Sequence, residues 1–268
     1  MSRLRFLDIP ARLESDPGGR GRAVGTLVLI HGFPLSGHIW EPQFVLSENG
    51  WRVIVPHLRG FDEGAAGRSA TSMDDYAGDI IDLLDSLHIE QAVIGGLSMG
   101  GYVTFALLRN APAYFQGLLL ADTRPQADAP EGRQGRERMI ATVRDKGPSA
   151  VADDMLPKLL GDSTRREHPG LVEEVRAIIM SNGAETIAGA LTAMMNRPDS
   201  TPTLRTVKLP TLIIVGEEDT LTPPQLSVEM HNAIAGSELV RIAGAGHMSN
   251  MERPGQFNDA VARFLSRF

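Results

Sequence analysis

Cysteine is absent from all 268 residues of the chain. A chain without cysteine can form no disulfide, offers no thiolate to a metal ion and cannot use a cysteine nucleophile. This composition suits a reducing compartment, and we expect a cytoplasmic protein. The N-terminal segment is charged and lacks a long apolar stretch, which is not the pattern of a secretory signal.

An excess of positive charge is missing as well. The chain carries 26 basic and 33 acidic side chains, for a formal net charge of −7. Because proteins that bind nucleic acid need a basic face for the phosphates, we expect no nucleic-acid partner. The longest aliphatic runs, such as residues 27–30, are far shorter than the about 20 apolar residues that span a bilayer. We therefore expect no membrane partner.

Short apolar runs recur along the chain and predict a sheet. They are rich in leucine and β-branched residues and alternate little, which is typical of strands buried on both faces of a parallel sheet. A more polar run at residues 4–9 predicts an antiparallel edge strand. The buried strands are predicted at residues 26–30, 53–55, 92–94, 117–120, 212–215 and 239–242.

Helical patterns separate these strands. Apolar residues at spacings of three or four predict helices that start near Ser72 and Pro254. Strands that alternate with helices predict an α/β fold with a doubly wound, mostly parallel sheet. The alternation stops within residues 124–207, where four amphipathic stretches occur instead, at 136–146, 150–160, 171–180 and 186–195.

We read the interrupted region as an insertion. The prediction is a core formed by residues 1–123 and 208–268, with a helical cap at residues 124–207. Ordinary crossover helices are the alternative. The cap methionines either line an acyl pocket or fill the core between the cap helices; they are Met139, Met155, Met180, Met194 and Met195.

One short motif carries chemistry. Residues 96–100 read Gly-Leu-Ser-Met-Gly, which matches G-x-S-x-G, and they follow a predicted strand and precede a predicted helix at 102–109. Glycine two residues before and two residues after the serine lets the backbone turn tightly without a Cβ clash. The motif predicts that Ser98 is an exposed nucleophile at the carboxyl end of the sheet.

A serine hydroxyl needs a base and an orienting carboxylate. His247 lies in a loop of small residues after the strand at 239–242, from which its imidazole can reach Ser98. Asp219, 28 residues earlier, ends another strand and is the predicted acid. Asp122, which follows the strand at 117–120, is the rival acid. Glu217 and Glu218 are predicted to be solvated loop charges.

The remaining histidines are predicted to have structural rather than catalytic roles. His31 precedes a glycine at a strand end and is predicted to hold its loop. Five histidines lack a site-like context and are expected on the surface or in packing: His38, His57, His88, His168 and His231.

Arg124 is predicted to lie on the surface, with contact to an anionic substrate as the alternative.

An oxyanion hole is the last requirement. The backbone N–H of Met99, directly after the nucleophile, is one predicted donor, and the N–H of Phe33 in the loop after the first buried strand is the other. Pro34 cannot donate, because its nitrogen carries no hydrogen.

With these motifs and Leu58-Arg59-Gly60, the chain resembles the α/β-hydrolase superfamily over nearly its whole length. Within it, the chain is similar to small bacterial carboxylesterases, enol-lactonases and cofactor-free perhydrolases. The order Ser, Asp, His is the one described for this fold. Two departures stand out: His57, where relatives often carry aspartate, and a longer loop at residues 61–68.

Together these features predict a serine hydrolase that cleaves a small-molecule ester or lactone through an acyl-enzyme, without a metal or an organic cofactor. Two alternatives on the same fold are a C–C bond hydrolase and a perhydrolase, the latter suggested by Pro34. A non-catalytic ligand receptor is the third alternative.

Overall fold

The computed structural model describes residues 4–12, 23–62 and 70–268. Its sheet has seven strands in the order β1-β3-β2-β4-β5-β6-β7. All pairings are parallel except that of the edge strand β1 with β3. The strands are β1 (Phe6–Ile9), β2 (Gly25–Ile30), β3 (Trp51–Pro56), β4 (Ala92–Leu97), β5 (Phe115–Ala121), β6 (Thr211–Gly216) and β7 (Glu238–Ile242).

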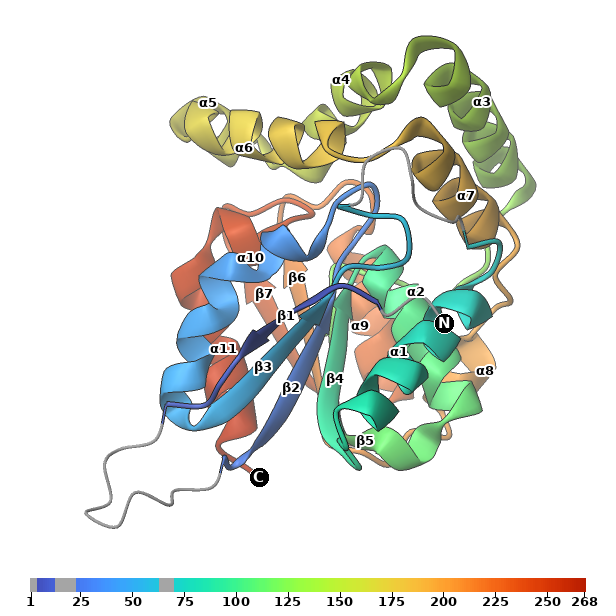
Figure 1. The fold of residues 1–268 in the computed structure, drawn as a ribbon. Coiled ribbons are helices and arrows are strands. Elements are labelled where there is room, and N and C mark those ends of the chain that lie inside the picture. Colours follow the sequence, from blue (N-terminus) through green and yellow to red (C-terminus); the bar gives the residue numbers. More distant parts are fainter. Residues whose placement is uncertain (1–3, 13–22, 63–69) are drawn as a thin grey trace.

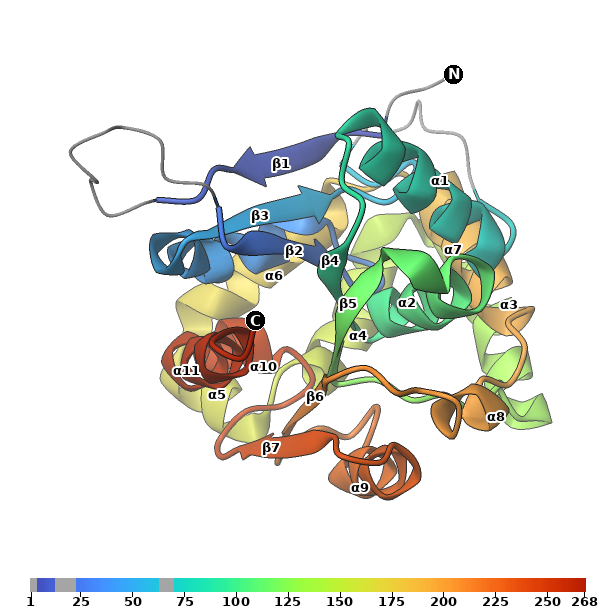
Figure 2. The ribbon, with the colours of Figure 1, turned by 90° about the horizontal axis from the view of Figure 1, so that it is seen from below.

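Helices cover both faces of the sheet (Figure 2). One face carries α1 (Met73–Ser86), α2 (Met99–Asn110) and α9 (Pro224–Ala233). The other carries the 3-10 segment η1 (Gly37–Asn49) and α11 (Pro254–Leu265). Because the sheet is covered on both sides, β4 and β6 are buried along their whole length, which explains their continuous apolar sequence. The predicted doubly wound, mostly parallel α/β sheet is confirmed.

Local signals in the sequence set the helix ends. Ser72 accepts a hydrogen bond from the Asp75 N–H at 3.0 Å, and the Asp75 carboxylate accepts the Ser72 N–H at 2.9 Å. This reciprocal pair is a capping box and fixes the start of α1. Helix α2 begins at Met99, three residues earlier than predicted, so that Ser98 itself is the residue before the helix.

Five helices lie above the carboxyl edge of the sheet (Figure 1). All five lie within residues 124–207, the segment predicted as a helical insertion, which we call the cap. They are α3 (Pro130–Lys146), α4 (Pro148–Leu159), α5 (Asp162–Glu167), α6 (Pro169–Met180) and α7 (Ala184–Met195). Three shorter elements complete the described chain: η2 (Pro112–Tyr114), α8 (Thr201–Leu204) and α10 (Ser249–Glu252). Within the described residues, no helix has the length and apolar character needed to cross a membrane.

The turn between β4 and α2 depends on two glycines. A Cβ atom on Gly96 would lie 2.1 Å from the backbone carbon of Gly100. A Cβ atom on Gly100 would lie 2.1 Å from the carbonyl oxygen of Ile30 in β2. Both obstacles are backbone atoms, which cannot turn aside as a side chain can. Strand β4, helix α2 and strand β2 therefore meet at a distance that only glycine permits.

Replacing Gly96 with alanine tests this close approach. We expect Gly96→Ala to lower the free energy of unfolding by about 3 kcal/mol, because backbone must move to admit the methyl group. Gly78→Ala is the matched control, since nothing lies within 4 Å of a Cβ at that position in α1. The control should change stability by less than about 1 kcal/mol, in the stabilising direction. Chemical denaturation measures both, and equal losses would contradict the argument.

Candidate active site

Ser98 lies in a strained turn at the carboxyl edge of the sheet. Its φ of 56° and ψ of −115° are values that residues with a side chain rarely adopt. Hydrogen bonds on both of its backbone polar groups hold it there. The Ser98 N–H donates to Ala121 O at 3.0 Å, and Ser98 O accepts from Thr123 Oγ1 at 2.8 Å and from Gly101 N at 2.9 Å. The neighbouring strand end therefore fixes the turn on both sides of the serine.

His247 and Asp219 meet at the same edge. Asp219 Oδ2 lies 2.8 Å from His247 Nδ1, and both residues are almost fully buried. The loop after β6 secures the carboxylate, because Asp219 Oδ1 accepts the N–H groups of Leu221 and Thr222 at 2.8 and 2.9 Å. The Thr222 hydroxyl donates to Asp219 Oδ2 at 2.6 Å. The carboxylate is thus hydrogen-bonded through both oxygens.

Each of the two residues shifts the pKa of the other toward its charged form. Burial raises the pKa of Asp219, but the charge of His247 and the hydrogen bonds outweigh it, and the net pKa is lowered. Burial lowers the pKa of His247, but the charge and hydrogen bond of Asp219 outweigh it, and the net pKa is raised. An ionised carboxylate can only accept a hydrogen bond, so Nδ1 of His247 carries the proton. In the neutral imidazole, Nε2 is then free to act as a base.

Asp122, the rival acid, lies elsewhere in the network. It is fully buried, with Oδ1 accepting the Gly216 N–H at 2.8 Å and Oδ2 bonded to the Ser249 hydroxyl. Burial, and then the charge of nearby Asp219, raise its pKa well above the usual range, which favours the neutral acid. Asp122 therefore ties the loop that carries Asp219 to the helix that follows His247, whereas Asp219 contacts the imidazole.

Phe33 and Met99 are the residues predicted to supply the oxyanion donors. In the part of the chain that the structure describes, the Phe33 N–H has no hydrogen-bond partner. Met99 is the first residue of α2, where backbone N–H groups have no acceptor within the helix. The Phe33–Pro34 peptide is cis, and Leu35 N donates to Gly32 O at 3.1 Å to close the loop.

His31 holds this loop, as predicted. Its Nε2 accepts the Leu58 N–H at 2.9 Å, and its Nδ1 donates to Gly32 O at 2.9 Å. Burial lowers the pKa of His31 to about 3, so the ring is neutral. Because both ring nitrogens are engaged with backbone, His31 is unavailable as a base. It joins the loop after β2 to the Leu58-Arg59-Gly60 segment after β3.

Sequence reasoning missed Glu252. This side chain is 4% exposed, and its Oε1 accepts the N–H groups of Gly246 and Met248, the two neighbours of His247, at 2.9 and 3.1 Å. Its Oε2 accepts the N–H of Gly161, between α4 and α5, at 2.9 Å. One buried carboxylate therefore fixes the histidine loop and attaches it to the cap. The sequence gives no sign that distinguishes this glutamate from an exposed one.

The prediction for Glu218 was wrong. Its carboxylate accepts the Ser163 N–H at 2.9 Å and also the Ser163 hydroxyl, at the start of α5. These hydrogen bonds lower the pKa of Glu218. Ser163 lies 55 residues away in the chain, so the contact depends on tertiary packing that local sequence does not reveal. Glu217 is exposed as predicted and pairs with Arg241 at 3.8 Å.

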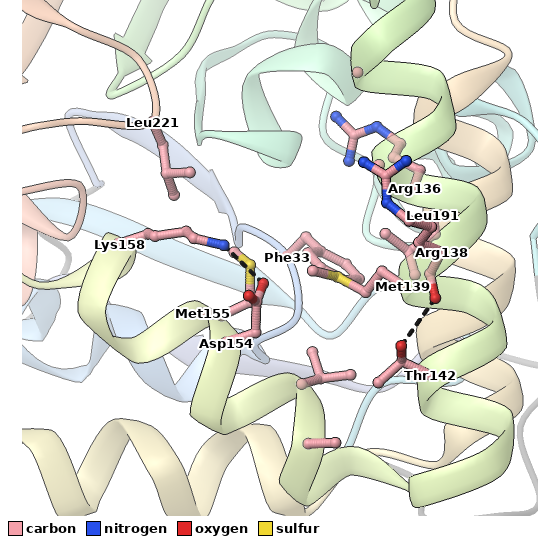
Figure 3. A pocket seen from close by; sticks show the side chains of 14 residues that line it. Phe33, Arg136, Arg138, Met139, Thr142, Asp154, Met155, Lys158, Leu191 and Leu221 are labelled. Atoms are coloured by element: carbon pink, nitrogen blue, oxygen red, sulfur yellow. Dashed lines mark hydrogen bonds and ion pairs between the residues drawn. The ribbon is translucent and has the colours of Figure 1, made fainter.

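A cavity of about 630 Å³ lies between the cap helices and this edge of the sheet (Figure 3). Phe33, a predicted oxyanion donor, and Leu221, in the loop that holds Asp219, line it from the core side. Met139 and Met155 line it from α3 and α4, whereas Met180 is 46% exposed on the cap surface. The lining also includes four charged side chains, the cations Arg136, Arg138 and Lys158 and the acid Asp154.

Arg124 does not lie free on the surface. It pairs with Asp128 at 3.0 Å, and Arg197 pairs with the same carboxylate at 2.9 Å. Arg136, at the cavity wall, also bonds Asp128. The guanidinium of Arg197 in turn stacks over the ring of Tyr102 in α2, 4.0 Å from its centroid. This arginine cluster joins the first cap residues to helix α2.

Replacing Glu252 with glutamine tests how the histidine loop is held. Glutamine has one acceptor oxygen in place of two, so at least one backbone N–H of the three must lose its partner. We expect the free energy of unfolding to fall by about 2 kcal/mol. The turnover of p-nitrophenyl butyrate should fall as well. Glu173→Gln, at an exposed position in α6, is the control and should change neither. Chemical denaturation and turnover are the measurements, and a variant indistinguishable from wild type would contradict the role of Glu252.

Known proteins share this fold. The structure is similar to that of an esterase from Thermogutta terrifontis, with a TM-score of 0.89 and 36% identity over 98% of this chain and 93% of that one. An enol-lactonase from Burkholderia xenovorans LB400 gives a TM-score of 0.86 at 27% identity, covering 98% and 96%. 3-oxoadipate enol-lactonase 2 from Acinetobacter baylyi is 27% identical over 86% of this chain and 84% of its own length. Residues 25–254 match the model of the alpha/beta hydrolase fold family, and the chain therefore belongs to the α/β-hydrolase family.

Proposed function

We propose that the chain is a serine hydrolase that cleaves carboxylic esters or lactones through an acyl-enzyme. The observation that carries the proposal is the buried hydrogen bond between His247 and Asp219 at the sheet edge where Ser98 occupies its strained turn. A buried imidazole with an ionised partner and a free Nε2 is the base that a serine nucleophile requires.

In this proposal, Ser98 Oγ attacks the substrate carbonyl carbon while His247 Nε2 takes the hydroxyl proton. Asp219 keeps the proton on Nδ1 and stabilises the imidazolium that forms, which is the direction in which it shifts the pKa of His247. The imidazolium then returns the proton to the departing alkoxide. The alcohol leaves, or in a lactone stays attached to the acyl chain, and an ester joins the acyl group to Ser98.

Phe33 and Met99 supply the oxyanion hole in the proposed reaction. Negative charge develops on the carbonyl oxygen during attack, and two backbone N–H groups that are already oriented stabilise it without reorganisation. Met99 begins helix α2, so the positive end of the helix dipole adds to this effect. Water activated by His247 then attacks the acyl-enzyme, and the same two amides stabilise the second oxyanion.

The cavity supports a small-molecule substrate. Its volume of about 630 Å³ is within the range of small-ligand sites. Apolar side chains form much of its wall, including Phe33, Met139 and Leu191, and would accommodate an acyl chain. The names of the similar proteins, an esterase and two enol-lactonases, support ester and lactone bonds as the target.

Removing the nucleophile or the base tests the reaction. We expect Ser98→Ala and His247→Ala each to lower kcat for p-nitrophenyl butyrate by about 10⁴-fold or more, because members of a triad act as a unit. Ser266→Ala, at an exposed position after α11, is the control and should keep full activity. Esterase assays with parallel chemical denaturation give the result. Binding without turnover in wild type would favour the receptor, and turnover of dienone acids alone would favour the C–C bond hydrolase.

The two buried aspartates should differ in their effect on the rate. Asp219→Asn is expected to lower kcat by about 10⁴-fold, because an amide that donates to Nδ1 selects the wrong imidazole tautomer. Asp122→Asn should cost less than about tenfold, because the raised pKa of Asp122 favours a neutral acid that asparagine resembles in shape and charge. Esterase kinetics on both folded variants measure the two losses in kcat. A larger loss in Asp122→Asn than in Asp219→Asn would make Asp122 the acid.

A further inference from the structure

Three potential metal ligands converge beside the loop of Phe33 and Pro34. His38 lies in η1, His57 directly follows β3, and Asp62 lies five residues later. One ligand atom from each lies within 4.8 Å of the other two. Asp62 Oδ1 is 3.5 Å from His38 Nε2, and Asp62 Oδ2 is 3.7 Å from His57 Nδ1. The two histidines were expected in packing or on the surface, and nothing in the sequence indicates that they meet.

These separations favour shared ligation over direct hydrogen bonds. Nitrogen–oxygen hydrogen bonds have distances of about 2.7–3.2 Å, so both contacts are too long. Two ligand atoms bound to one tetrahedral ion at about 2.0–2.1 Å are roughly 3.4 Å apart. The observed separations of 3.5 and 3.7 Å are close to this spacing. Small side-chain rotations would bring all three donors onto one ion.

The ring of His38 is oriented for a metal. Its Nδ1 lies 2.6 Å from Glu41 Oε1, and because a carboxylate only accepts, Nδ1 must donate. In the neutral ring this leaves the Nε2 lone pair facing Asp62. A histidine that donates one N–H to a carboxylate and offers the other nitrogen is the arrangement found around bound metal ions.

The other two ligands are held by backbone contacts. Asp62 has a left-handed φ of 60°, and its N–H donates to Asn182 Oδ1 at 2.9 Å. Asn182, which follows α6 of the cap, also donates to Pro34 O at 2.9 Å. The His57 N–H donates to Arg5 O at 2.9 Å, and its Nδ1 accepts the Gly37 N–H at 3.3 Å. That nitrogen therefore carries no proton in this arrangement, and an ion would replace the long contact with Gly37.

We propose that His38, His57 and Asp62 form a binding site for a divalent transition-metal ion of the Zn²⁺ type. Two imidazoles and one carboxylate suit Zn²⁺, Co²⁺ or Ni²⁺, whereas Mg²⁺ and Ca²⁺ prefer oxygen ligands alone. Solvent completes the coordination. The ion has a structural role and no part in ester cleavage, since it ties η1 to the chain after β3 and, through Asn182, to Pro34 and the cap.

Arg5 is the group that the ion displaces. Its guanidinium lies 3.3 Å from Asp62 Oδ2 and also bonds the Asp62 backbone carbonyl. The Arg5 side chain is 57% exposed, so it can turn into solvent at little cost. A divalent ion offers the carboxylate a larger charge at a shorter distance than this exposed pair does.

Metal titration of the tag-free full chain, stripped with EDTA, tests the site. We expect ZnCl₂ to bind with one equivalent per chain in calorimetry and to raise the melting temperature, while MgCl₂ does neither. Co²⁺ should give the visible absorption of a nitrogen- and oxygen-ligated ion. His38→Gln and His57→Gln should each weaken Zn²⁺ binding at least about tenfold and remove the Co²⁺ spectrum.

His168→Gln, an exposed histidine outside the cluster, is the matched control and should bind as wild type does. His38 is 39% exposed, so its variant is expected to fold even if the buried His57 variant does not. The absence of stoichiometric Zn²⁺ binding, or equal affinity in wild type and a folded His38→Gln, would overturn the proposal.

Discussion

The left-handed backbone at Ser98 is the constraint on which the rest of the structure depends. The backbone of a residue that carries a side chain is strained in this conformation. Such strain persists only where the surrounding structure leaves no alternative. Gly96 and Gly100 let β2, β4 and α2 approach to backbone contact. Ala121 at the end of β5 and Thr123, two residues later, bond both sides of the turn. The buried parallel sheet thus holds one hydroxyl at its carboxyl edge.

Two carboxyl groups near one imidazole differ because their environments differ. Asp219 faces His247 and several N–H donors, which favour its ionised form. Asp122 is buried near that negative charge, and a second carboxylate there would be repelled, so its neutral form is favoured. In the proposed mechanism, Asp219 therefore orients the base, whereas Asp122 is a neutral link between loops. Such a division is a property of packing, since both residues simply follow strands in the sequence.

The sheet could be predicted because burial on both faces imposes a continuous apolar sequence. All seven strands lie where these patterns indicate. The prediction that the strand at 239–242 is buried on both faces was wrong, because β7 is the other edge strand of the sheet and only Ile242 in it is buried. The fold class and the family were also confirmed. The 3-10 segment η1 was not predicted, because Pro42 interrupts it and its apolar residues show no helical period. The longer loop noted at residues 61–68 lies, from residue 63 on, outside the described residues.

The candidate site was only partly predictable for a related reason. Ser98, Asp219 and His247 stand at strand ends, where parallel topology brings separate segments together, so their positions could be inferred. The roles of Glu252, Glu218 and Asn182 depend on partners far away in the chain, with separations of 91, 55 and 148 residues. Local sequence carries no trace of such contacts.

These distant contacts unite the cap with the site. A Cβ atom on Gly246, next to His247, would lie 2.3 Å from the backbone nitrogen of Gly161 in the cap. Glu252 and Glu218 bond backbone on either side of this junction, at Gly161 and Ser163. The start of α5 is therefore fixed to the histidine loop, and displacement there would disturb His247. Because Phe33 and Leu221 of the core line the cavity together with α3, α4 and α7, the contacts that fix the cap to the core also set the shape of the cavity.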